Sequence, residues 1–230
     1  MGSLADDNHY GHGLNARTVE YCFRVFSRHF VAGSCLELGP AEGIMTAHLD
    51  HVFDDLTAVD ASPQFCASLR NRFPSITVVE TLFEQYAPER AFDNVVLGHV
   101  LEHVVDPVTV LRSVRDWVRP DGRLLAAVPN AHSAHRQMAV LMGMLHSESQ
   151  LNDTDARMGH RRVYSQAELR HDLEAAGFRI LVAGGYWLKP LSNAQLEREW
   201  TPEMIQAAMQ VGERHPDIAA EIYVIASVAG

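Results

Sequence analysis

Short apolar runs alternate along the chain with longer segments in which apolar residues recur at helical spacing. In the first such segment, residues 15–30, Val19, Phe23, Phe26 and Phe30 lie three or four positions apart, which predicts a helix with one buried face. Further helices are predicted at 43–51, from Ser62-Pro63 onwards, and from Asp106-Pro107 to about Val118. Strands are predicted, in chain order, at 34–38, 56–59, 76–79, 92–97 and 123–128.

This alternation predicts an α/β fold with a mostly parallel sheet and helices on both faces. Right-handed crossovers then place a ligand at the carboxyl ends of the strands, near the point where the strand order reverses. After Pro129 the pattern loosens. The elements predicted there are a helical apolar stretch at 138–145, a capped helix at 165–176, a strand at 179–183, a mostly helical segment at 191–214 and a last strand at 221–227.

We interpret the 230 residues as a single domain. Residues 1–33 form an N-terminal helical cover and residues 34–129 a cofactor-binding core. The two late insertions, 130–164 and 186–220, are long for a compact scaffold, and such insertions often serve as lids or binding loops. They are therefore predicted to lie on the acceptor side.

Composition excludes some classes of function. A net charge of -10 argues against a nucleic-acid partner, because phosphate binding needs a basic face. No apolar run approaches the roughly 20 residues that cross a bilayer, and the polar start from Met1 to His12 lacks the core of a signal peptide. We therefore expect a cytoplasmic protein without a membrane partner. Its three cysteines have no CxxC spacing and are expected to be reduced.

The first chemical signal is the turn that follows the first predicted strand. Glu37 ends that strand, Gly39 allows close backbone approach, and Gly43 opens the next helix. The G-x-G-x-x-G spacing of a dinucleotide site is absent, and a carboxylate at Glu37 would repel phosphates. It would accept a hydrogen bond from an ammonium group. The alternative is structural, since a tight strand-to-helix turn needs glycine in any case.

Two further signals follow the second and third strands. Asp60, followed by Ala61 and Ser62, stands where an acid can take both hydroxyls of a ribose, although helix capping is a common use for aspartate. Thr81 and Leu82 follow the third strand. Leu82 could cover an adenine face or simply pack in the core.

Taken in order, these residues resemble the class I S-adenosylmethionine (SAM) methyltransferases, specifically the ubiquinone-biosynthesis O-methyltransferase type. The resemblance covers about residues 34–128. It rests on Glu37-Leu38-Gly39, Gly43, Val59-Asp60, Glu80-Thr81, Leu101-Glu102-His103-Val104 and Pro120-Asp121-Gly122. In this family three glycines usually occupy the first loop, and Ala41 replaces the middle one here.

The resemblance implies a Rossmann-like sheet of seven strands whose last strand is antiparallel. It also implies SAM as cofactor, with S-adenosylhomocysteine (SAH) as product. The methionine end would contact Glu37 and Gly39, the ribose Asp60 and the adenine Leu82. Gly98 and His99 would contribute main-chain contacts beside the sulfonium.

Methyl transfer from an activated sulfonium asks mainly for alignment and exclusion of water, although a hydroxyl acceptor benefits from a base. His103, or else His99, is the candidate base. If this segment is helical, the two histidines share a face at i, i+4. The alternative is a structural histidine bonded to main chain. No metal is expected, because HExxH and a carboxylate pair at diagnostic spacing are both absent.

The acceptor side is predicted from polar and aromatic residues that follow the fifth and sixth strands. They are His132, His135, Arg136, Asp155, His160, Arg161, Tyr186 and Trp187. A solvated loop and simple core cover are the alternatives for these segments. Tyr10, His12 and Tyr21 could close over the cofactor, as N-terminal segments often do in the family.

We expect methylation of an oxygen or nitrogen of a small polar metabolite, in specialised natural-product metabolism such as antibiotic biosynthesis. The alternatives are a SAM-using cyclase or aminocarboxypropyl transferase, a nicotinamide oxidoreductase, and a non-catalytic cofactor-binding protein. A homodimer is compatible with the sequence. The acceptor, and the choice between oxygen and nitrogen, stay open.

Overall fold

The computed structural model describes residues 13–230 and contains one seven-stranded sheet. The strands are β1 (Cys35–Leu38), β2 (Leu56–Asp60), β3 (Thr77–Glu80), β4 (Phe92–Gly98), β5 (Val118–Pro129), β6 (Phe178–Tyr186) and β7 (Glu221–Val228). Their order in the sheet is β3-β2-β1-β4-β5-β7-β6. The first five strands pair in parallel, and β7 runs antiparallel to both of its neighbours, β5 and β6. The predicted Rossmann-like sheet with an antiparallel last strand is confirmed.

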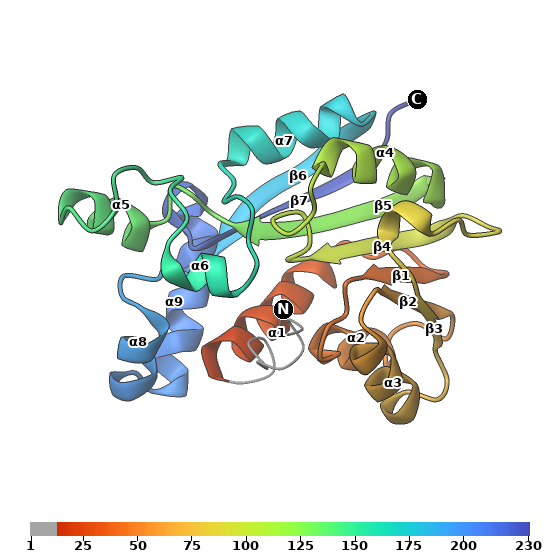
Figure 1. Ribbon diagram of the computed structural model, residues 1–230, viewed down its shortest axis with the longest axis horizontal. Helices are drawn as coiled ribbons and strands as arrows, with labels where there is room; N and C mark the ends of the chain where they lie inside the picture. The colour runs from red at the N-terminus through yellow and green to blue at the C-terminus, as the bar shows by residue number, and fades with distance from the viewer. Residues whose placement is uncertain (1–12) are drawn as a thin grey trace.

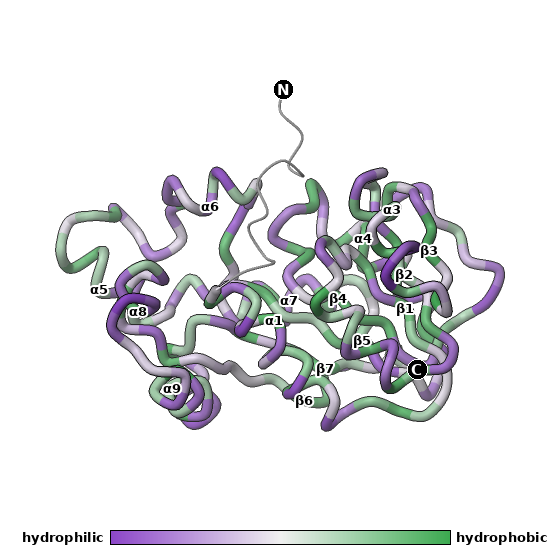
Figure 2. The backbone as a smooth tube through the Cα atoms, turned by 90° about the horizontal axis from the view of Figure 1, so that it is seen from below, coloured by the Kyte–Doolittle hydropathy of each residue, from purple (hydrophilic) through white to green (hydrophobic). Residues whose placement is uncertain are grey.

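Helices cover both faces of this sheet (Figure 1). One face packs against α4 (Pro107–Trp117) and α7 (Gln166–Ala175) through the larger apolar cluster. The other face packs against α1 (Gly13–Phe26), α2 (Ile44–Leu49), α8 (Asn193–Glu199) and α9 (Pro202–Arg214) through a second cluster. Side chains alternate between the faces, so Leu36 joins the first cluster and Cys35 the second. Apolar stretches accordingly follow the strands (Figure 2).

The strand order reverses between β1 and β4, which are neighbours although β2 and β3 separate them in sequence. Parallel strands on either side of such a reversal leave a crevice at their carboxyl ends. The remaining elements near this edge are α3 (Pro63–Arg72), the 3-10 turns η2 (Phe83–Gln85) and η3 (Pro216–Ile218), α5 (Ala134–Leu141) and α6 (Asp153–Arg157). Over the described part of the chain, no helix combines the length and apolar character needed to cross a membrane.

Two sequence-based details were wrong. The helix predicted at 138–145 is α5, which begins at Ala134 and ends at Leu141, and Gly143 follows it with φ +72°. The strand predicted at 123–128 is β5, which already begins at Val118, so Pro120-Asp121-Gly122 lies inside it, where the pairing with β4 shifts register. Residues 10 and 12, Tyr10 and His12, lie outside the described residues, so their predicted closure over the cofactor is a prediction only. Tyr21 is buried in α1.

The exit of β6 against α9 gives a first testable prediction. A Cβ on Gly212 would lie 2.2 Å from the backbone nitrogen of Trp187, which itself donates to the carbonyl of Met209. Gly212→Ala is therefore expected to lower the free energy of unfolding by about 1–3 kcal/mol in urea, although alanine favours helix by up to about 1 kcal/mol. Gln210→Ala, on an exposed position of the same helix, is the control. Equal unfolding curves for the two variants would contradict this close contact.

Candidate active site

The turn between β1 and α2 closes a small cavity at the carboxyl edge of the sheet. The cavity measures about 50 Å³ and is lined by Glu37, Gly39, Met45, Gly98 and His99 among others. Gly39 adopts φ +66°, and a Cβ there would approach Val100 Cγ2 to 3.0 Å. Four residues that the sequence assigned to the cofactor therefore meet at one cavity.

Glu37 is the buried acid of this turn. It is 2% exposed, and its Oε2 accepts a hydrogen bond of 2.7 Å from the Thr46 hydroxyl. Burial raises the pKa of Glu37 to about 8, the Thr46 bond opposes that rise, and the charge of Asp60 adds to it. With no cation among the described residues acting on it, the carboxyl is mostly protonated at neutral pH, and a bound ammonium group would favour its ionised form.

Asp60, at the end of β2, joins the two loops. One carboxylate oxygen accepts from the Ser62 nitrogen at 2.8 Å, and the other accepts from the Ala41 nitrogen at 3.3 Å. Ser62 caps α3 through the Phe65 nitrogen. Glu37 and Asp60 thus lie toward the carboxyl ends of the paired strands β1 and β2, as the cofactor hypothesis requires. The main-chain bonds also match the structural alternative, so a ribose at Asp60 is still a prediction.

The other cofactor candidates lie along the same edge but outside the small cavity. Thr81 donates its backbone N–H to the Asp60 carbonyl at 3.0 Å, and Ala61 adjoins Asp60 in the chain. Leu82 is 50% exposed, which removes simple core packing as its explanation. A Cβ on Gly43 would approach Leu69 Cδ2 to 2.6 Å, so packing against α3 accounts for that glycine without a ligand.

His99 connects this small cavity to a larger one. It follows β4 directly, with φ +61°, and lines both the small cavity and a second cavity of about 500 Å³. Its Nδ1 lies 3.5 Å from Glu102 Oε1 and 3.8 Å from Glu221 Oε2, and its Nε2 lies 3.3 Å from the Tyr186 hydroxyl. Burial alone would lower the pKa of His99, but hydrogen bonds with Cys22 and Glu102 and the nearby carboxylate charges raise it well above its ordinary value.

His103 does not share a helical face with His99, because residues 99–103 form turns rather than a helix. That part of the base hypothesis is wrong. His103 Nδ1 lies 3.3 Å from the Gly159 carbonyl, and burial lowers the pKa of this imidazole. His103 does not line either the small or the larger cavity. Of the two candidate bases, only His99 faces the acceptor side.

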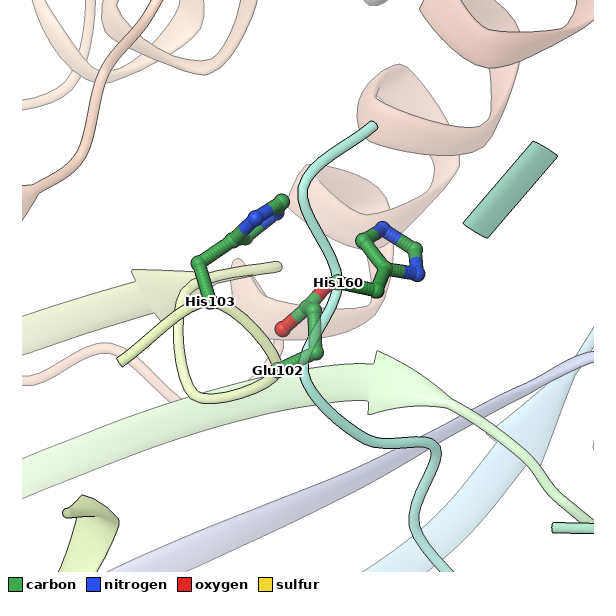
Figure 3. Close-up of side chains that lie close together, drawn as sticks. All are labelled: Glu102, His103 and His160. Carbon is green, nitrogen blue, oxygen red and sulfur yellow. The ribbon is translucent and has the colours of Figure 1, made fainter. Parts of the chain in front are cut away.

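Glu102, His103 and His160 form a cluster that sequence spacing did not reveal (Figure 3). Their ligand atoms lie within 4.8 Å of one another, and the Glu102 side chain is fully buried, with its Oε1 3.5 Å from His99 Nδ1. One carboxylate and two imidazoles are a donor set that could hold a divalent transition metal. The expectation of no metal overlooked this group because His160 lies far from the other two in sequence.

The larger cavity collects part of the predicted acceptor set. His135, Arg136, Asp155, His160 and Trp187 line it. The other three do not. His132 is exposed and pairs with Glu148, Arg161 is exposed and donates to the His103 carbonyl, and Tyr186 is buried against His99. Among the lining residues that sequence reasoning missed, four carry an ionisable side chain: Glu102, Lys189, Glu197 and Glu221.

Arg136 and Asp155 form a buried ion pair. Arg136 Nη1 donates to Asp155 Oδ2 at 3.0 Å, Nε donates to the Glu148 carbonyl at 2.7 Å, and Nη2 donates to the Gln150 carbonyl. The Arg136 side chain is only 4% exposed. Because its guanidinium is already bonded on every nitrogen, Arg136 primarily holds the 148–155 loop against α5.

The sheet is doubly wound, and a buried acid, Glu37, lies at the point where its strand order reverses. His99 lines both the cavity at this point and the larger one. This arrangement is that of a class I SAM-dependent methyltransferase. A family model described as a methyltransferase domain matches residues 8–182. The chain therefore belongs to the methyltransferase-domain family, as the sequence predicted.

Relatives agree with that assignment. A ubiquinone biosynthesis O-methyltransferase from Xanthomonas euvesicatoria is 29% identical over 138 residues, which cover 56% of this chain and 56% of the relative. The chain thus spans about half the length of the curated relatives it matches. A SAM-dependent methyltransferase from Thermotoga maritima, described as a possible histamine N-methyltransferase, has a TM-score of 0.67 at 15% identity, covering 93% of this chain and 91% of that chain. The glycopeptide N-methyltransferase MtfA, solved with SAM, has a TM-score of 0.62 at 17% identity, covering 97% and 90%. These two structures share the fold.

Proposed function

We propose that the protein transfers the methyl group of SAM to an oxygen or nitrogen of a small polar metabolite held in the 500 Å³ cavity. The observation that carries this proposal is the position of His99. It lines both the turn expected to take the methionine end and the cavity expected to take the acceptor. Donor and acceptor would therefore meet at this residue.

The residues of the turn fit SAM. Among the described residues, the buried Glu37 has no cationic partner. Any side chain at position 39 would crowd Val100 and reduce the volume of the small cavity. Glu37 would hold the ammonium, Asp60 the ribose hydroxyls, and Leu82 would lie against the adenine. When bound, SAM supplies a methyl group already activated by its sulfonium.

The protein then has to orient the acceptor and keep water away from the methyl group. Trp187, Arg136 and Asp155 line the cavity. His99 lines it where it adjoins the small cavity expected to take SAM. A hydroxyl acceptor would give its proton to His99, or to His103 through a rearrangement of the turn. An amine acceptor would need only to be neutral when it attacks.

The relatives support this reaction class without fixing the acceptor. The curated relatives are named as O-methyltransferases, whereas several structural neighbours are named as N-methyltransferases, one of them acting on a glycopeptide. That neighbour supports specialised natural-product metabolism as the setting. The cytoplasmic location, the homodimer and the absence of a required metal stay predictions.

The test is incubation with methyl-labelled SAM and a metabolite extract, followed by mass spectrometry of the products. We expect SAH and one labelled small molecule. Calorimetry with SAM and with SAH provides the binding control. The proposal fails if neither compound binds, or if SAM is consumed without forming SAH, as cyclisation or aminocarboxypropyl transfer would require.

A further inference from the structure

The donor end of the larger cavity is acidic. Glu221, at the start of β7, lines the cavity with a side chain that is 14% exposed, and its buried Oε2 has no hydrogen-bond partner. A second carboxylate, Glu102, lies next to His99, with its Oε1 3.5 Å from the His99 Nδ1. A buried carboxylate oxygen without a partner is costly, so Glu221 is ready to accept a hydrogen bond from a ligand.

The same cavity is lined by Lys189, in the loop after β6, whose pKa is lowered by burial. It is the only lysine of the chain. Among residues 13–230 no carboxylate lies within 4.0 Å of its ammonium, although the charges of Glu221 and Asp155 act on it from further away. All three guanidinium nitrogens of the neighbouring Arg136 already donate hydrogen bonds to protein groups. Lys189 is therefore the cation available to a ligand.

One cavity thus offers a hydrogen-bond acceptor at Glu221 and an ammonium at Lys189, and among residues 13–230 no salt bridge of 4.0 Å or less joins these two groups. We propose that the acceptor is an amino acid or a similar zwitterion. Its amine would lie beside Glu221 and His99, and its carboxylate would bind Lys189. This inference rests on the proposed methyl transfer and names the substrate class of that reaction.

The chemistry of an amine fits the groups that surround His99. Glu102 and Glu221 place carboxylate oxygens 3.5 Å and 3.8 Å from this imidazole, so a positively charged amine beside them would be stabilised. A hydroxyl acceptor would instead need a base to remove its proton during the attack.

An amine avoids that requirement. Its ammonium form can give one proton to the Glu221 carboxylate, and the neutral nitrogen then attacks the methyl carbon. A nitrogen–carbon bond forms while the carbon–sulfur bond breaks, and the electron pair stays on sulfur to give SAH. The methylated ammonium product carries the remaining positive charge.

The test uses the full chain, methyl-labelled SAM and defined probes. These are the twenty standard amino acids, the amines obtained from leucine and phenylalanine by decarboxylation, the matching hydroxy acids, and an unfractionated metabolite extract. We expect the labelled products to be N-methylated, with each amino acid favoured over its decarboxylated amine by at least about tenfold in kcat/KM. Products methylated on a hydroxyl, or an equal kcat/KM for an amino acid and its decarboxylated amine, would overturn the inference. So would the absence of any labelled product while SAM still binds.

Substitutions of Lys189 and Glu221 distinguish a role in substrate binding from a purely structural role. Lys189→Met is expected to raise the KM for the zwitterion at least about tenfold and to change activity on the matched amine less than about twofold, since a charge-assisted bond is lost only with the former. Glu221→Gln is expected to lower kcat about tenfold with SAM affinity unchanged. Arg170→Met, at an exposed position of α7, is the matched control.

If Lys189→Met lowers thermal stability and affects amine and amino acid equally, the lysine only pairs within the fold and the inference is wrong. Loss of SAM binding in the parent protein would instead count against the proposed function.

Discussion

Replacing Glu37 with glutamine is expected to weaken SAM binding at least about tenfold and, in the same variant, to stabilise the ligand-free protein at pH 8. Both effects arise from one buried carboxyl. In the complex its ionised form would accept hydrogen bonds from the ammonium of SAM, and charge-assisted bonds of this kind contribute about 1.5–3 kcal/mol. Without ligand, the same negative charge is buried beside no cation among the described residues.

The pH dependence follows from the raised pKa of Glu37. Burial lifts it from 4.5 to about 8, so the folded state binds a proton that the unfolded state releases. The stability that this carboxyl contributes is fully present below pH 4.5 and is lost as the pH rises through about 8. At 1.36 kcal/mol per pH unit, the loss is on the order of 4 kcal/mol. Glutamine cannot ionise, so this part of the pH dependence should disappear.

Urea unfolding at pH 5 and pH 8, with calorimetry of SAM binding, measures both halves of the prediction. Glu174→Gln, on the exposed face of α7, is the matched control and should change neither quantity appreciably. A Glu37→Gln protein that is stabilised at pH 8 but binds SAM as tightly as the parent would make Glu37 a structural residue of the turn.

Replacing Asp155 with alanine is expected to lower the free energy of unfolding at pH 7 by about 3–5 kcal/mol, because the buried Arg136 guanidinium would lose its ionic partner. Asp155 also closes the capping box of α6 by accepting from the Asn152 nitrogen at 2.9 Å. The loss should therefore appear as melting of the 148–160 loop, before any specific change in acceptor affinity.

The destabilisation caused by Asp155→Ala should become smaller at low pH. Burial alone would raise the pKa of Asp155, but hydrogen bonds from His160 and Asn152 and the charge of Arg136 lower it to about 2. The carboxylate therefore stabilises the fold fully above about pH 4, and this contribution is lost as the pH falls through 2.

Two controls accompany denaturation of Asp155→Ala. Asp153→Ala, exposed on the same helix, should cost less than about 0.5 kcal/mol. A double variant with Arg136→Met and Asp155→Leu should be more stable than the single variant, because no unpaired charge stays buried. A stable Asp155→Ala protein with a raised KM would instead support the original assignment of Asp155 to the acceptor.

The residues assigned to the donor side lie together in the structure because their sequence signals are local. Glu37, Gly39 and Asp60 lie at or next to the carboxyl ends of β1 and β2, and parallel topology brings such positions to one edge of the sheet. The residues assigned to the acceptor side lie together only in part, because the cavity walls come from segments far apart in the chain. Lys189 and Glu221 line the same cavity because β6 and β7 pair with Tyr186 opposite Glu221.

The histidines were misjudged for a different reason. A helix over 99–103 would have placed His99 and His103 on one face, but His99 adopts a left-handed backbone and turns the chain. Hydrogen bonding to Ala127 in the neighbouring strand holds the His99 nitrogen in that position. Tertiary contacts of this kind leave no periodic trace in sequence.

The antiparallel β7 is inserted between β5 and β6. Until it docks, both neighbours present open backbone edges to solvent, and such edges readily capture foreign strands. Its ladder with β5 also closes a long sequence separation, which slows folding. In a nascent chain the turn between β1 and α2 is therefore expected to form early, and the larger cavity is expected to be completed last. Aggregation during synthesis is expected to start at β5 and β6.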